Sequence, residues 1–581
     1  MMLDPLNPLI VQNDRTLLLD VHVPKAEAAR AAIIPFAELE KAPEHIHTYR
    51  ITPLSLWNAA SAGFSPQDII AVLRAYTRYE VPPGIGEGFF HTMARYGKIR
   101  LIAPLRGTSC TESFPGFPEE LLLVSDDPAV LREIQAADGL AQYVHTIPQG
   151  FSLHLRDRGN IKWELIKLGW PVKDEAPLVP GEPLDIGIRE LSLAGLPFTP
   201  RPYQREAVQA VLGDQGPGTG YGVVVLPCGS GKTVVGMILM SRLKTHTLIL
   251  TTSIAAVHQW IRELLDKTGL TKAQIAEYTG DVKSVAPVTV ATYQILTWRP
   301  HKTGDFPHFR LFRERSWGLI IYDEVQLLPA PVFRITAELQ AVRRLGLTAT
   351  LVREDGAEDA VFSLVGPKRY DVPWKDLELK GWIAQAICRE IRLDLPKPLK
   401  IPYAVASSRE KYRIASENPL KAGIVQYLVD THGEDQILVI GQYLDQLASL
   451  AKLLKAPLIT GKTPQGERET LYDAFRKSQF RLIVVSKVAN YAIDLPDASM
   501  AIQVSGSFGS RQEEAQRLGR ILRPKGRGAA GSPSQGSYPQ GRNAYFYTLV
   551  SRNTVEERFA ANRQQFLVEQ GYTYAIQDWA G

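Results

Sequence analysis

Two acidic residues end an apolar run in the segment LIIYDEVQLLPA, residues 319–330. Asp323 and Glu324 follow a stretch that is typical of a buried strand. Two adjacent carboxylates at the end of such a strand can support a metal ion and polarise a water molecule for attack on a phosphate. An isolated acidic pair is more often a solvated turn, so the pattern predicts hydrolysis only if the chain also provides a phosphate site.

The segment YGVVVLPCGSGKTVVGMILMSRL, residues 221–243, predicts that phosphate site. Its order of strand, Gly-rich turn and helix is the order of a phosphate-binding loop. Gly229 and Gly231, on either side of Ser230, can take backbone angles that point N–H groups at phosphate oxygens, and the helix N-terminus adds partial positive charge. Leu226 stands where the strict motif has its first Gly, so the motif is a variant.

The two segments together predict an ATP site that requires Mg²⁺. Lys232 would reach the β and γ phosphates, and the Thr233 hydroxyl would hold the metal ion. Asp323 would lie in the second coordination shell of the same ion, and Glu324 would polarise the attacking water. Ligands bind at the carboxyl ends of parallel strands, so segments that are distant in the sequence can meet there.

Strands alternate with helices from about residue 202 onward, which is typical of parallel sheets built from βαβ units. The rhythm occurs twice and predicts two α/β domains. The first third of the chain has a different texture. Thr52 with Pro53, and Ser65 with Pro66, each place a capping residue before Pro and predict two short helices.

The first third also contains LLLVSDDPAVLREI, residues 121–134, which predicts a strand, a capped turn and a helix. The segment YVHTIPQGFSLHL, residues 143–155, predicts a hairpin. We expect residues 1–170 to form an α+β accessory region for damage recognition or DNA docking. A packing or partner-binding domain is an equal alternative, because the region has no catalytic cluster and no basic stripe. The Pro-rich residues 171–198 are expected to be a linker.

The composition is that of an ordinary globular protein, with 581 residues, 45% of them hydrophobic and 22% charged. A net charge of +5 weakly favours an acidic partner. Cys110, Cys228 and Cys388 lack the spacing of a disulfide framework or a zinc site. No apolar run is long enough for a membrane helix, and Asp4 interrupts any signal peptide. We therefore expect a cytoplasmic, nucleoid-associated protein without a membrane partner.

The ordered motifs resemble those of superfamily 2 helicases, and among them the XPB-like DNA helicases of the bacterial and archaeal type. The resemblance covers about residues 200–571. It rests on RPYQREAV (201–208), GSGKT, LTTSIAAVHQW (250–260), ATYQIL (291–296), DEVQ, LGLTATLVRED (345–355), VVSKVANYAIDLPDA (484–498) and RQEEAQRLGRILRPK (511–525).

The resemblance implies a fold class of two RecA-like parallel-sheet domains that form an ATP cleft behind the N-terminal α+β region. The first domain would span residues 199–366, and the second residues 367–581. A small thumb-like insertion is expected near residues 396–420.

The resemblance also assigns the remaining nucleotide contacts. Arg201 and Gln204 would read the adenine, although a buried helical Gln is the simpler alternative. Arg517 and Arg520 would be arginine fingers that reach the γ phosphate. Asp494 would accept from the ribose or brace Arg520.

Nucleic-acid contacts carry weaker signals, because enzymes of this kind grip the sugar-phosphate backbone. An isolated Ser or Thr is more commonly a helix cap. The resembling family links an Arg-Glu-Asp triplet to strand separation, and a charged surface turn is the alternative for that triplet. The residues implied are Ser253, Thr292, Tyr293, Arg353, Glu354, Asp355, Thr460, Ser486 and Lys487.

The implied activity is an ATP-dependent DNA helicase, 3'-5' by resemblance, that couples hydrolysis to translocation and strand separation in DNA repair. Its partners would be single-stranded, duplex and forked DNA, with a nuclease or repair protein as a further candidate. The alternatives are a double-stranded DNA translocase that does not unwind alone and an ATP-gated DNA-binding scaffold. RNA stays an alternative substrate, because backbone grips do not identify the sugar.

Gln326 is the unusual residue of the DEVQ motif. Resembling enzymes often carry His at this position, where the side chain links the hydrolysis site to the DNA-gripping motifs. A Gln can donate and accept hydrogen bonds but cannot become charged near neutral pH. We expect Gln326 to transmit between the two sites through hydrogen bonds alone.

Overall fold

The computed structural model describes most of the chain. The described residues are 4, 6–41, 45–104, 112–114, 117–118, 120–137, 139–213, 219–227, 229–301, 306–329, 332, 342–349, 358–372, 374–380, 382–486, 498–506, 518, 543–569, 572 and 574–579. None of the helices in these ranges is long and apolar enough to cross a membrane.

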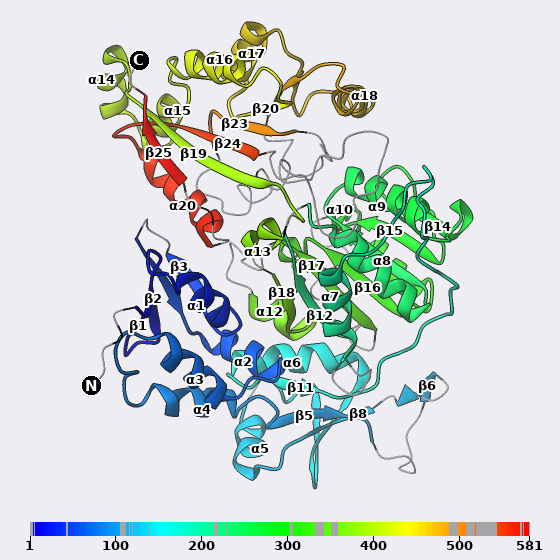
Figure 1. The fold of residues 1–581 in the computed structure, drawn as a ribbon. Coiled ribbons are helices and arrows are strands. Elements are labelled where there is room, and N and C mark those ends of the chain that lie inside the picture. The colour runs from blue at the N-terminus through cyan, green and yellow to red at the C-terminus, as the bar shows by residue number, and fades with distance from the viewer. Residues whose placement is uncertain are drawn as a thin grey trace. The chain divides into compact units, whose positions relative to one another are not determined.

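A parallel sheet forms the centre of the first predicted α/β domain (Figure 1). Within the described ranges its strand order is β14 (Ile275–Tyr278), β15 (Val288–Thr292), β13 (Thr247–Thr251), β16 (Leu319–Asp323), β17 (Arg343–Thr348), β12 (Tyr221–Val225) and β18 (Lys368–Asp371), and every pairing is parallel. The flanking helices are α7 (Pro202–Leu212), α8 (Lys232–Leu243), α9 (Ile254–Lys267), α10 (Tyr293–Thr297) and α12 (Glu358–Leu364). The predicted alternation of strand and helix is confirmed.

A second parallel sheet repeats this architecture. In the part of the chain that is described, its order is β21 (Leu458–Ile459), β22 (Leu482–Val485), β20 (Ile437–Ile440), β23 (Met500–Gln503), β24 (Asn543–Ser551), β19 (Gln385–Leu393) and β25 (Tyr574–Asp578). Its helices are α13 (Trp374–Leu379), α14 (Lys397–Val405), α15 (Ser408–Ser416), α16 (Lys421–Thr431), α17 (Leu444–Leu454), α18 (Gln465–Arg476) and α20 (Val555–Glu569). The fold class of two parallel-sheet domains is therefore confirmed.

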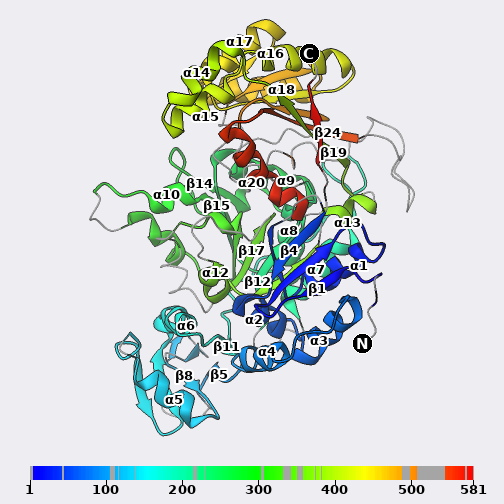
Figure 2. The same ribbon diagram turned by 90° about the vertical axis from the view of Figure 1, so that its left-hand side faces the viewer.

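The N-terminal region is built from smaller pieces, shown in blue and cyan in Figure 2. An antiparallel sheet has the order β1 (Leu9–Val11), β2 (Thr16–Asp20), β4 (Ile46–Arg50) and β3 (Glu38–Lys41), with helices α1 (Ala26–Ile33), α2 (Pro53–Ser61), α3 (Pro66–Tyr76) and α4 (Ile85–Met93). A mixed sheet has the order β11 (Val172–Asp174), β5 (Ile99–Ile102), β8 (Glu120–Val124), β10 (Gly150–His154) and β9 (Val144–Ile147), with helices α5 (Pro128–Gln135) and α6 (Arg158–Lys167). The short strands β6 (Glu112–Phe114) and β7 (Phe117–Pro118) pair with each other.

Local sequence signals explain the N-terminal helices. The Thr52 hydroxyl accepts from the Ser55 N–H at 3.0 Å, and the Ser65 hydroxyl accepts from the Asp68 N–H at 3.2 Å. Each cap satisfies a backbone donor that the first helical turn leaves without a partner. The two predicted helices are confirmed, as is the hairpin formed by β9 and β10.

The chain separates into two compact units. The first contains Met1–Val225 and Lys232–Asp371, and the second contains Leu226–Gly231 and Val372–Gly581. Strand β18 pairs with β12, so the first sheet extends a few residues past the expected boundary at residue 366. The expected linker also contributes structure, because β11 pairs in parallel with β5.

A buried ionic cluster joins the N-terminal region to the first sheet inside the first unit. Arg158 donates to Asp174 at 2.8 Å, and Lys162 donates to the same carboxylate at 2.9 Å. The Tyr221 hydroxyl donates to the Asp174 carbonyl at 2.9 Å, and the Arg344 guanidinium lies 4.9 Å from the Tyr221 ring centre. Because Tyr221 and Arg344 belong to β12 and β17, the N-terminal region is anchored on the strands that lead to the predicted ATP site.

Candidate active site

The carboxyl ends of the central strands meet at one edge of the first sheet. Strand β17 lies between β16 and β12, with Asp323 in register with Leu347 and Thr348 in register with Val225. The acidic pair that follows β16 and the loop that follows β12 therefore leave the sheet at the same edge. This is the place where open parallel sheets bind ligands.

The loop after β12 has the backbone of a phosphate-binding turn. Gly229 and Gly231 have φ angles of +78° and +81°, in the left-handed region that favours glycine. Ser230 is buried, and its hydroxyl donates to the Pro227 carbonyl at 2.6 Å, which closes the turn. Helix α8 begins directly after the loop, at Lys232. This conformation fits the β and γ phosphates of a nucleotide.

The acidic pair is held in a strained and partly buried position. Glu324 has φ and ψ angles of +51° and +55°, a left-handed conformation that costs a non-glycine residue about 1–2 kcal/mol. Its carboxylate lies 3.8 Å from the Lys232 ammonium. Burial, together with the negative charge of Glu324, raises the pKa of Asp323 to about 6. A divalent cation would relieve this repulsion, so the donor set fits Mg²⁺.

Gln326 connects the acidic pair to the next strand. Its amide nitrogen donates to a Glu324 carboxylate oxygen at 2.8 Å, and its amide oxygen accepts from the Thr348 hydroxyl at 2.6 Å. Gln326 and Thr348 are 4% and 0% exposed. A neutral amide can serve both bonds at once, because it carries a donor and an acceptor. These two hydrogen bonds connect the carboxylate that would polarise water with Thr348, which belongs to the motif at 345–355.

Trp260 is a site residue that was not predicted from the sequence. Its indole N–H donates to Asp323 at 2.9 Å, and the ring is 1% exposed. Gly236 of α8 makes room for it, because a Cβ there would lie 2.7 Å from the Trp260 ring. Trp260 lies in the quoted motif at 250–260, but its identity alone reads as a core residue.

Gln204 has a local structural role. Its side-chain oxygen accepts from the Arg201 N–H at 2.8 Å and caps the start of α7, and the residue is 3% exposed. The Arg201 guanidinium donates to the Tyr203 hydroxyl at 3.0 Å. The simpler alternative of a buried helical Gln therefore describes this geometry, and adenine recognition by Arg201 and Gln204 stays a prediction.

The nucleic-acid residues of the first domain divide into two groups. Ser253 and Thr292 cap α9 and α10 by accepting from Ala256 and Ile295 N–H groups, which is the ordinary alternative. They lie at the same sheet edge, because β13 pairs with β15. Tyr293 is 3% exposed, and its hydroxyl donates to the Asp323 carbonyl at 3.0 Å. The buried side chain of Tyr293 thus supports the backbone of the acidic pair, and its contact with a nucleic acid stays a prediction.

In the second domain, Thr460 accepts from the Lys462 N–H at 3.2 Å within a turn. Ser486 is buried and directly follows β22. The expected thumb corresponds to α14 and α15, and α14 has no buried residue. The predictions for Arg353, Glu354, Asp355, Lys487, Asp494, Arg517 and Arg520 lie outside the described residues.

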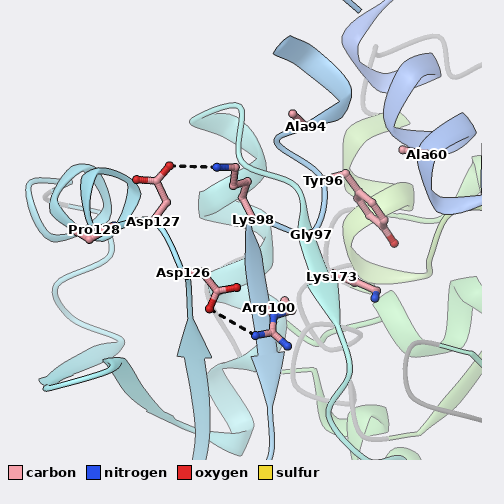
Figure 3. A pocket seen from close by; sticks show the side chains of 10 residues that line it. All are labelled: Ala60, Ala94, Tyr96, Gly97, Lys98, Arg100, Asp126, Asp127, Pro128 and Lys173. Atoms are coloured by element: carbon pink, nitrogen blue, oxygen red, sulfur yellow. Dashed lines mark hydrogen bonds and ion pairs between the residues drawn. The ribbon is translucent and has the colours of Figure 1, made fainter. Parts of the chain in front are cut away.

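A pocket in the N-terminal region is separate from this site (Figure 3). Its cations are already matched by acids: Lys98 lies 3.1 Å from Asp127, and Arg100 lies 3.8 Å from Asp126. Lys173, which also lines the pocket, pairs with an acid as well. The charges therefore balance, and the pocket gives no reason to assign an anion to it.

Comparisons with known proteins agree with the motifs. The family model described as ERCC3/RAD25/XPB C-terminal helicase matches residues 377–579, and that of the type III restriction enzyme res subunit matches residues 197–353. A helicase conserved C-terminal domain model matches residues 9–146, in the N-terminal region.

Curated relatives match over almost the whole chain. A DNA 3'-5' helicase XPB of Kineococcus radiotolerans is 52% identical over 98% of this chain and 96% of its own length. The protein of the same name from Mycobacterium tuberculosis is 49% identical over 98% of both chains. The XPB helicase/translocase subunit of general transcription and DNA repair factor IIH from Schizosaccharomyces pombe is 32% identical over 98% of this chain and 75% of its own. At this identity and coverage, the chain belongs to the XPB family of superfamily 2 helicases.

Proposed function

We propose that the chain is an ATP-dependent DNA helicase that moves in the 3'-5' direction and couples ATP hydrolysis to translocation and strand separation in DNA repair. The names of the two bacterial relatives support the substrate and the polarity. The observation that carries the proposal is a path of one ion pair, Lys232 to Glu324, and two hydrogen bonds, from Gln326 to Glu324 and from Thr348 to Gln326. A hydrolysis site that reports to another site needs such a connection.

The residues of the site divide the work of hydrolysis. Bound Mg²⁺ would neutralise charge on the β and γ phosphates. Lys232 would stabilise the negative charge that develops on the γ phosphate, and the N–H groups around Gly229 and Gly231 would orient it. Glu324 would accept a hydrogen bond from the attacking water and take its proton.

The remaining groups are proposed from the resemblance. Arg517 and Arg520 would supply positive charge to the γ phosphate, and Asp494 would position the ribose or Arg520. Ser253, Thr292, Thr460, Ser486 and Lys487 would grip the DNA backbone at positions that carry no sequence information. Residues 353–355 would act in strand separation. The protein would work in the cytoplasm on nucleoid DNA, and a nuclease or repair protein would be a fitting partner.

A double-stranded DNA translocase is the second candidate. The eukaryotic relatives carry the name helicase/translocase, which favours this alternative for the wider family. A translocase would hydrolyse ATP on duplex DNA and release no strand.

The test is ATP turnover with single-stranded DNA, duplex DNA or RNA as the activator. We expect stimulation by DNA, little stimulation by RNA, and loss of turnover in Lys232→Ala and Glu324→Gln. Turnover that no nucleic acid changes would overturn the proposal, and preferential stimulation by RNA would overturn the choice of DNA.

A further inference from the structure

An exposed tryptophan lies shortly after the carboxyl end of β15, the sheet edge at which Ser253 and Thr292 are proposed to contact nucleic acid. Trp298 is 53% exposed and is the one tryptophan among the exposed large apolar side chains of the described residues. An indole carries more apolar surface than any other side chain, so leaving it in water forfeits much of the stabilisation that burial would give. A role in binding would account for its position.

The indole is held in place by its neighbours. The Trp298 ring packs edge-on against His308, with centroids 5.7 Å apart and planes at 60°. His308 is 8% exposed, and its Nδ1 shares a hydrogen bond of 2.9 Å with the Tyr278 hydroxyl. The backbone N–H of Trp298 donates to the Ile295 carbonyl at 3.3 Å, which fixes the main chain that carries the ring. A ring supported in this way is a fixed surface, which lowers the entropic cost of stacking on it.

A second planar group stands beside the indole in the sequence. The Arg299 guanidinium lies 5.1 Å from the Phe306 ring centre, and Phe306 stacks on Phe309 at 4.8 Å with planes 25° apart. Arg299 is exposed. The column of rings ends in a guanidinium, a planar cation that stacks on aromatic bases.

Two cations lie near His308, the residue that packs against the Trp298 ring. Burial lowers the pKa of His308, and the charges of Lys283 and Arg310 lower it further. Arg310 is itself paired with Glu314 at 3.3 Å, so part of this charge is compensated. A fixed aromatic face followed in the chain by an exposed guanidinium matches a polyanion that carries aromatic rings better than it matches an apolar protein surface.

The position along the chain agrees with this chemistry. Helix α10 starts directly after Thr292 at the carboxyl end of β15 and ends at Thr297, one residue before Trp298. The Gln294 amide donates to the Thr252 carbonyl, which ties α10 to the loop that begins α9. Trp298 therefore follows the edge to which the backbone-gripping role of Ser253 and Thr292 is assigned.

We propose that Trp298 and Arg299 form a stacking platform for the bases of single-stranded DNA. The platform rests on the proposed function, since it assumes that DNA is the substrate. It would bind bases by their faces, without sequence preference, and would hold the strand while backbone contacts change during translocation.

The test compares Trp298→Ala with Trp298→Phe by fluorescence anisotropy of a labelled oligothymidylate. We expect the Ala variant to raise the dissociation constant about tenfold, because stacking on one aromatic ring contributes on the order of tenfold or more in affinity. The Phe variant keeps an aromatic face and should stay within about threefold of the wild type. Tyr427→Ala is the matched control: Tyr427 is 54% exposed and packs edge-on against Trp579.

Arg299→Ala provides an independent readout. Loss of one cation that contacts single-stranded DNA should reduce the slope of log affinity against log salt by about 0.7, whereas Trp298→Ala should leave that slope unchanged. In DNA-stimulated ATP turnover, Trp298→Ala should raise the DNA concentration for half-maximal stimulation about tenfold and keep the maximal rate.

The outcomes separate the platform from the proposed function. If Trp298→Ala binds DNA with wild-type affinity, the platform is overturned. The proposed helicase function is tested separately, because it depends on DNA stimulation of ATP turnover in the wild type. Equal losses in the Ala and Phe variants would also overturn it, because stacking tolerates Phe. If Trp298→Ala does not fold, the other two variants decide. A loss of affinity of about tenfold in Trp298→Phe would contradict stacking on Trp298, and an unchanged salt slope in Arg299→Ala would contradict the role of Arg299 in the platform.

Discussion

Replacement of Gln326 tests the bonded path through the active site. In Gln326→Ala, the Glu324 carboxylate loses a donor at 2.8 Å and the Thr348 hydroxyl loses an acceptor at 2.6 Å. A hydrogen bond to a charged group contributes about 1.5–3 kcal/mol, and a neutral one contributes about 0.5–1.5 kcal/mol. The buried groups left behind should therefore lower the free energy of unfolding by about 2–4 kcal/mol.

The substitution should reduce the stimulation of ATP turnover by DNA more than it reduces ATP turnover without DNA. Lys232 and Glu324 remain in Gln326→Ala, so ATP turnover without DNA should stay within about threefold of the wild type. Stimulation by DNA should fall about tenfold if the link contributes about 1.4 kcal/mol to the stimulated state. Gln326→His should keep basal turnover and change the stimulation, because an imidazole bonds with different geometry and can become charged.

The assay is steady-state ATP turnover with and without saturating single-stranded DNA. Thr348→Val is the matched variant, because it removes the hydroxyl, nearly preserves the side-chain volume and leaves the bond between Gln326 and Glu324 in place. We expect Thr348→Val to lose DNA stimulation as Gln326→Ala does. Unchanged stimulation in Gln326→Ala would refute the reasoning and leave Gln326 as a residue that fills space.

Three further predictions concern the surroundings of the site and the N-terminal region. Gly236→Ala should lower ATP turnover and destabilise the fold by about 1–3 kcal/mol, because its Cβ would lie 2.7 Å from Trp260; normal turnover in a folded variant would contradict this. Burial and the charge of Arg30 lower the pKa of His47 to about 4, so His47 stabilises the folded state above pH 6.5 and that stability is lost as the pH falls toward 4. Urea unfolding should show that His47→Gln loses about 2 kcal/mol less than the wild type between pH 7 and pH 5, and equal losses would contradict the assignment. Asp174→Asn should destabilise the protein by about 3–5 kcal/mol in urea unfolding, because two buried cations share that carboxylate; an unchanged midpoint would show that they do not depend on it.

The elements of the fold were predictable where local signals decide them. Caps such as Thr52 and Ser65, and the alternation of strands and helices, depend on neighbouring residues and on periodicity. The order of strands in a sheet depends on long-range pairing. The segment at 172–174 was therefore expected to be a linker, since its Pro-rich surroundings carry no sign of a partner strand at β5.

The candidate site was predictable for its reactive groups and not for its supports. Glycines with positive φ angles and paired acids have recognisable types and spacing, as Gly229, Gly231 and Glu324 show. Trp260 and Tyr293 act through contacts with Asp323 that span 63 and 30 positions of the chain. An aromatic residue in an apolar run reads as core, so only the packing of α9 and α10 near the carboxyl end of β16 reveals these contacts.

Strand displacement from a tailed duplex tests the central claim most directly. A labelled duplex with a 3' single-stranded tail and one with a 5' tail would be incubated with the protein, ATP and Mg²⁺, and Glu324→Gln would serve as the inactive control. The account predicts ATP-dependent release of the labelled strand from the 3'-tailed duplex alone, and none with Glu324→Gln. DNA-stimulated ATP turnover without any released strand would contradict it and identify a translocase instead.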